Sequence, residues 1–228
     1  MKKQGRLSRS SVGEFSASDW KSEGHSLLLF SKTLRIQWLL KRRRLIRRLR
    51  EENFGTVGHL SVDLDLIQHD QALVKSSTLL IGYAIEMYLK AGLANSLIGC
   101  PEELFSCLSR KFSHDYTAIA EFIGFPTDRV ILEDLSALSS AVQFDARYPI
   151  SAANNEDYIN KTNERRQRLA DNTRYKRYRL LAKSLDHYTY KMLGSTKNPL
   201  STGWVTSTEM VTSVTAWAAV YPQESPTS

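Results

Sequence analysis

The sequence predicts an all-α protein that folds as an antiparallel helical bundle, with a flexible N-terminal arm and a C-terminal tail. The stretch from Leu73 to Leu97 is apolar almost all round, which is typical of a buried central helix. Two longer segments, 20–50 and 155–192, carry apolar residues on one face and bases on the other, as amphipathic helices do. The alternation of Val, Thr and aromatic residues that favours strands is scarce.

Length and charge suggest one domain and an anionic partner. With 228 residues, of which 42% are hydrophobic, the chain is long enough to bury a large core without disulfides. We expect a disordered basic arm over residues 1–18, a helical bundle over 19–193, and a Ser/Thr-rich, partly docked tail over 194–228. The 31 Lys and Arg against 24 Asp and Glu give a net charge of +7, which favours RNA or another polyanion as partner.

Several classes of protein are excluded by the composition. Cys100 and Cys107 are too few for a disulfide framework and wrongly spaced for zinc. The basic start lacks the apolar segment of a secretory signal, and the longest apolar run, Leu79 to Leu89, is too short to span a membrane. We therefore expect a cytoplasmic protein without a membrane span. His and Asp side chains between 59 and 69 lack a known ligand spacing, so neither a metal nor another cofactor is predicted.

The first predicted helix, from Asp19 to about Arg50, ends in the run KRRRLIRRLR over 41–50. Arg43, Arg47 and Arg50 lie opposite its apolar face, so they either form a solvated surface or contact a polyanion. The glycines that follow predict a loop over 53–70 before the central helix. On that central helix the polar residues Thr78, Gly82, Glu86 and Lys90 recur every four positions and form one narrow stripe.

Shorter helices are predicted next. Ser113 is expected to cap a helix whose first turn holds His114 and Asp115. Pro126 opens a further helix that ends near Asp145, and the tetrapeptide Ala-Arg-Tyr-Pro follows at 146–149.

The last predicted helix is a single long one over 155–192. Its inner stripe runs from Tyr178 to Met192, and Tyr175 and Tyr190 alternate with bases, an arrangement that serves phosphate binding and base stacking or merely a solvated face. The bases of its outer stripe are Arg165, Arg168, Lys176, Arg179 and Lys183.

The order of these motifs resembles the HEPN superfamily of helical bundle domains. Glu86 and Lys90 match its "E, three residues, K-A", His114 and Asp115 its "His-Asp" helix start, and Arg147 with Tyr148 its "Arg-Tyr-Pro". The resemblance covers about residues 20–192 and implies that these six side chains form one polar cluster. Members of this superfamily are often dimeric, act in toxin–antitoxin, phage-defence or RNA-processing settings, and include many metal-independent RNases.

The chain departs from the pattern of the catalytic members, in which four to six residues stand between an Arg and a His. The nearest pairs are Arg110 with His114 and Arg179 with His187, one spacing too short and the other too long. The resemblance therefore implies a diverged, non-catalytic homodimer that binds RNA or a nucleotide through its Arg-rich faces. Two alternatives stay open: a metal-independent endoribonuclease with an altered Arg/His pair, and a non-catalytic subunit that binds an acidic protein such as an antitoxin.

Overall fold

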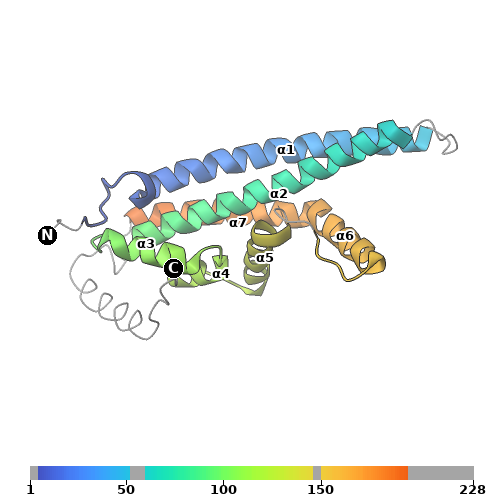
Figure 1. The fold of residues 1–228 in the computed structure, drawn as a ribbon. Coiled ribbons are helices and arrows are strands. Elements are labelled where there is room, and N and C mark those ends of the chain that lie inside the picture. Colours follow the sequence, from blue (N-terminus) through green and yellow to red (C-terminus); the bar gives the residue numbers. More distant parts are fainter. Residues whose placement is uncertain (1–4, 52–59, 146–149, 195–228) are drawn as a thin grey trace.

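The computed structural model describes residues 5–51, 60–145 and 150–194, and it confirms the predicted all-α helical bundle. Three long helices lie side by side: α1 (Ala17–Glu51), α2 (Leu60–Ser96) and α7 (Asn172–Gly194). Shorter elements cover the other side of α2, as Figure 1 shows. They are α3 (Glu102–Phe112), α4 (Tyr116–Phe122), α5 (Arg129–Ser140), a π-helical turn (Ala141–Asp145) and α6 (Asn155–Ala170).

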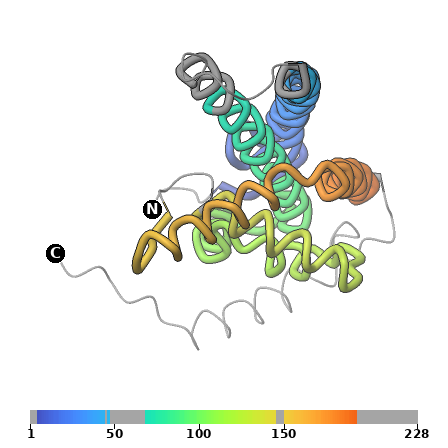
Figure 2. Tube along the Cα trace, turned by 90° about the vertical axis from the view of Figure 1, so that its right-hand side faces the viewer, coloured from blue at the N-terminus to red at the C-terminus, as the bar shows by residue number. Residues whose placement is uncertain are grey.

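Helix α2 is the central element, as its apolar sequence predicts. Its residues from Ile81 to Leu97 are nearly all buried, because α1 and α7 pack on one side and α3 to α5 on the other (Figure 2). The two glycines of α2 mark close contacts. A Cβ at Gly82 would lie 2.5 Å from a methyl group of Val142, and one at Gly92 would lie 2.7 Å from Ile123. Both glycines are therefore needed for packing.

Polar contacts also join the three long helices to one another. Asn95 of α2 donates to the carbonyl oxygen of Thr189 on α7 (3.1 Å), and Lys21 of α1 pairs with Asp186 on α7 (3.1 Å). Among the described residues, no helix combines the length and the apolar character that crossing a bilayer requires.

Two predicted boundaries along the long helices are wrong. The sequence predicts a loop over residues 53–70. Helix α2 begins at Leu60, so residues 60–70 belong to this helix. The second half of α1 supplies a packing partner there, and such tertiary contact outweighs the weak local signals. The single helix predicted over 155–192 is broken at Asp171. The Asp171 carboxylate accepts from the backbone N–H groups of Thr173 and Arg174, which caps the start of α7.

The N-terminal arm differs from the expectation of disorder through residue 18. Leu7 is 2% exposed and pairs with the turn after α2: its N–H donates to the Cys100 carbonyl (2.9 Å) and its carbonyl accepts from Gly99 (2.8 Å). A short 3-10 turn at Gly13–Phe15 then leads into α1. A third backbone hydrogen bond, from Glu102 to the Gly5 carbonyl (3.1 Å), adds to this attachment, so the arm packs against the bundle from Gly5 on. The predicted tail after Gly194 lies outside the described residues.

The turn between α3 and α4 also corrects the predicted cap. Ser113 has a positive φ of 47° and ends α3, whereas the N-cap of α4 is Asp115. The Asp115 carboxylate accepts from the backbone N–H of Ala118 (3.1 Å) and from the hydroxyl of Thr117 (2.7 Å). Aspartate is as good an N-cap as serine, so sequence alone did not separate the two.

Candidate functional site

A buried carboxylate on α2 forms the first site. Glu86 is 3% exposed, and both of its oxygens have partners. Oε1 lies 2.9 Å from the Nζ of Lys90, one turn further along α2. Oε2 accepts from Nδ1 of His114 (2.9 Å) and from the hydroxyl of Tyr116 (3.2 Å). Because a carboxylate can only accept, the His114 proton lies on Nδ1.

The partners of Glu86 are themselves held in place. Lys90 Nζ lies 5.1 Å from the centre of the Trp20 ring on α1, within cation–π range. The His114 carbonyl accepts from the hydroxyl of Ser139 on α5. Burial and the Glu86 charge raise the pKa of the Tyr116 phenol well above its usual range, so Tyr116 remains a hydrogen-bond donor. The cluster thus joins four helices at one buried charge.

This cluster matches only part of the predicted one. Glu86, Lys90 and His114 are brought together, but the Asp115 carboxylate caps α4 instead. Arg147 and Tyr148 lie outside the described residues. Tyr116 was missed, although its position two residues after His114 on an apolar face could have suggested it.

In neither of the two candidate Arg/His pairs do the two side chains contact each other. Arg110 is exposed and donates to the Ser106 carbonyl within its own helix (3.2 Å), whereas His114 faces Glu86. Arg179 is half-buried and His187 exposed, about two turns apart along α7. Across the described residues, no three His, Cys, Asp or Glu side chains gather in a way that could hold a metal ion.

A buried arginine, Arg35, anchors the second site, where α6 crosses the long helices. It is 2% exposed and donates to the last carbonyls of α6, Leu169 (2.8 Å) and Ala170 (3.2 Å). Its guanidinium lies between two rings, 4.2 Å from the centre of Trp38 and 4.7 Å from that of Tyr175. Burial lowers the pKa of Arg35 to about 10, despite the opposing effect of Tyr175 and Asp171.

Tyr175 is therefore not the exposed stacking residue that its place among bases suggested. It is 4% exposed, and its hydroxyl pairs with that of Ser31 (2.8 Å). Tyr190, by contrast, is 67% exposed, as predicted. Tyr175 lies three residues before the buried Tyr178, so it continues the inner face of α7 and contacts α1.

Basic side chains from three helices meet around this crossing. We call Arg42, Lys75, Arg165 and Arg166 the crossing surface. Arg42 lies 5.0 Å above the Trp38 ring, and the Gln71 carboxamide, with its oxygen turned to the guanidinium, accepts from Arg166 (2.8 and 3.2 Å). Burial and the charge of Arg165 lower the pKa of Lys75, so these two cations repel each other.

The other bases predicted to bind nucleic acid lie near this surface or further along α7. Arg43, Arg47, Arg168, Lys176 and Lys183 are exposed, and Arg165 and Arg179 are half-buried. The side chain of Arg50 lies outside the described part of the chain. Figure 1 shows that the second half of α1, the first half of α2 and α6 occupy the same end of the molecule.

No family model, no curated protein and no solved structure matches this chain.

Proposed function

We propose that the protein binds single-stranded RNA through the crossing surface, with Arg168 beside it. The observation that carries this proposal is the gathering of basic side chains from α1, α2 and α6 around the buried Arg35, at one end of the molecule. Basic side chains on one surface sum to a positive potential, which attracts the phosphates of a nucleic acid. The net charge of +7 and the Arg-rich end of α1 support the same class of partner.

The choice of RNA among polyanions rests on the HEPN-like order of motifs, which is a resemblance in sequence. An exposed aromatic ring adds support, because such rings stack on unpaired bases: Tyr158 lies on α6, the helix of Arg165 and Arg166, and is 51% exposed. Binding is preferred to cleavage because Arg110 donates to the Ser106 carbonyl within its own helix, and Arg179 lies about two turns from His187, so neither Arg/His pair is assembled in the described chain.

The test is the salt dependence of RNA affinity, measured by fluorescence anisotropy with a labelled single strand. For single strands, log affinity falls with log salt with a slope of about −0.7 for each phosphate neutralised. The double variant Arg166→Glu, Arg168→Glu should bind more weakly and give a flatter slope. Arg129→Glu is the matched control, because this arginine is 92% exposed on α5 and pairs with its neighbour Glu133.

If the native protein, the double variant and Arg129→Glu all give the same salt-dependence slope, the crossing surface is not the RNA-binding site. No binding at low salt would contradict the proposed function.

Running the RNA on a gel after the titration tests the alternative, that the protein is an endoribonuclease. If the RNA is cut without added metal, and His114→Ala or His187→Ala abolishes cutting at an unchanged melting temperature, the protein is an endoribonuclease. If RNA is ignored but an acidic protein binds in a salt-dependent way, the interaction subunit is the better account.

A further inference from the structure

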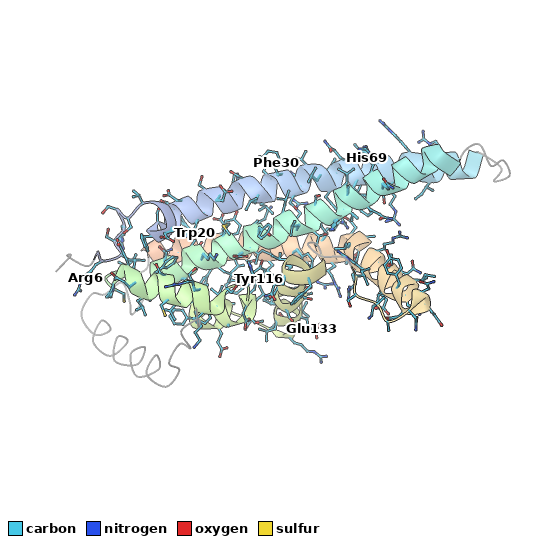
Figure 3. All side chains as sticks on the ribbon, viewed as in Figure 1. Arg6, Trp20, Phe30, His69, Tyr116 and Glu133 are labelled. Carbon is cyan, nitrogen blue, oxygen red and sulfur yellow. The ribbon has the colours of Figure 1, made fainter. Side chains whose placement is uncertain are left out.

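The outer face of α1 carries an apolar stripe that no described helix covers. Leu29, Phe30, Ile36 and Leu40 are 57%, 64%, 47% and 50% exposed, on the side opposite the buried Arg35. Figure 1 shows α1 along the upper edge of the bundle, and Figure 3 labels Phe30 there. A single exposed leucine is ordinary, but Leu29, Ile36 and Leu40 share one face of α1 with Phe30 beside them, which is typical of an interaction surface.

Leu29, Ile36 and Leu40 follow the spacing of a coiled-coil seam, and Phe30 flanks that seam. Alternating steps of four and three residues connect its members, and every one is exposed in the described structure. They are Ser22, Ser26, Leu29, Thr33, Ile36, Leu40, Arg43 and Arg47. Residues spaced by alternating steps of four and three positions stay on the side of a helix that faces one partner helix. The seam extends for ~37 Å at 1.5 Å per residue.

The distribution of charge along the seam selects the partner and its direction. Serines occupy one end and arginines the other, with Leu29 to Leu40 between. In a parallel pair of identical helices, Arg43 and Arg47 would each face their own copies, which is unfavourable. In an antiparallel pair about the midpoint between Leu34 and Arg35, Leu29 faces Leu40 of the second copy, and each seam arginine faces a small serine.

The positions beside the seam fit the same arrangement. In antiparallel coiled coils, the flanking positions of one helix meet the same flanking positions of the other. Glu23 and Arg44 are both exposed and occupy equivalent flanking positions three heptads apart. The antiparallel register brings Glu23 of each copy beside Arg44 of the other, so two opposite-charge contacts form by symmetry.

We propose that α1 pairs with α1 of a second copy of this chain as an antiparallel two-stranded coiled coil along Ser22–Arg47. This pairing goes beyond RNA binding and does not depend on it. It places Arg43 and Arg47 at the ends of the dimer seam, whereas Lys75, Arg165 and Arg166 belong to α2 and α6. The homodimer then presents two crossing surfaces related by the twofold axis.

The first test is oligomeric state by sedimentation velocity on the full chain at micromolar concentrations. The native protein should be a dimer, and Leu40→Glu should be a monomer with an unchanged helical circular dichroism spectrum, because Leu40 is exposed in the subunit. Leu180→Glu is the matched control, since Leu180 is 64% exposed on α7 and away from the seam. A monomeric native protein, or a Leu40→Glu variant that stays dimeric, overturns the proposal.

The second test fixes the direction and does not depend on how Leu40→Glu behaves. In a background in which Cys100 and Cys107 are replaced by Ala, Leu29→Cys and Leu40→Cys proteins are mixed and oxidised. The antiparallel pair should form a disulfide between position 29 of one protein and position 40 of the other. The Leu29→Cys protein alone should give none, because its two introduced thiols then lie ~16 Å apart along the axis. A strong cross-link with Leu29→Cys alone would overturn the antiparallel pairing.

Discussion

Glu86 holds together the buried cluster that it forms with Lys90, His114 and Tyr116. Glu86→Ala should lower the free energy of unfolding by ~3–5 kcal/mol, because it leaves Lys90 partly buried against Trp20 without its anion and leaves His114 and Tyr116 without an acceptor. Urea denaturation followed by circular dichroism measures the change. The matched control is Glu133→Ala, whose carboxylate is 63% exposed in its pair with Arg129 and should cost at most ~1 kcal/mol.

If Glu86→Ala and Glu133→Ala destabilise the protein equally, the cluster is not a structural centre. A Glu86→Ala protein that is as stable as the native one, but fails in a functional assay, would instead assign the cluster to the site of action.

At the scale of the residue, the sequence could predict Glu86, Lys90 and His114, because a four-residue spacing and a motif order are visible along the chain. It could not predict Arg35. Nothing nearby distinguishes this arginine from the exposed bases that follow, and its partners Leu169 and Ala170 lie more than 130 positions away. Its burial is a consequence of where α6 ends.

At the scale of the element, Arg35 stabilises the junction between α6 and α7, because it donates to the last carbonyls of α6. Arg35→Lys should destabilise this junction by ~2 kcal/mol, because an ammonium cannot donate to two carbonyls in the planar fork that also stacks between Trp38 and Tyr175. Hydrogen exchange should therefore speed up in the last turn of α6 and the first turn of α7. Exchange in α4, which Arg35 does not touch, serves as the internal control.

Unchanged exchange at the junction, or an equal increase throughout the protein, would contradict this role for Arg35.

Element boundaries were the weaker part of the sequence-based fold. The buried helix around Leu73–Leu97 and the amphipathic α1 were predictable, since periodicity alone carries them. The start of α2 at Leu60 and the break at Asp171 were not, because α1 stabilises the first and the Arg35 contacts accompany the second. In each case a partner distant in sequence decides a local conformation.

The whole molecule should lose stability in alkali. Burial raises the pKa of Tyr88 and Tyr178 to about 12, and it raises the pKa of Tyr116 well above the ordinary value of about 10. A raised folded pKa gives stability that is complete below about pH 10 and is lost as pH rises toward 12. The pKa values of Arg35 and Lys75 are lowered, which has the opposite effect on stability. Five tyrosines have raised pKa values, so their effect outweighs that of these two groups.

Urea midpoints measured between pH 8 and pH 11 test this expectation, with phenolate absorbance recorded on the same samples. The midpoint should fall above pH 10, and the buried phenols should ionise together with unfolding. A flat midpoint, or phenols that titrate freely in the folded protein, would contradict it.

The most direct test of the central claim, that the crossing surface holds cations for an RNA phosphate, is thermal melting of the native protein and Lys75→Gln, with and without excess single-stranded RNA. Without RNA, the variant should melt at a higher temperature, because it loses the cost of burying the Lys75 charge and the repulsion from Arg165. With RNA, the native protein should gain more stability than the variant, because a ligand stabilises in proportion to its affinity for the folded state. A variant that melts lower without RNA, or an equal effect of RNA on both proteins, would contradict the account.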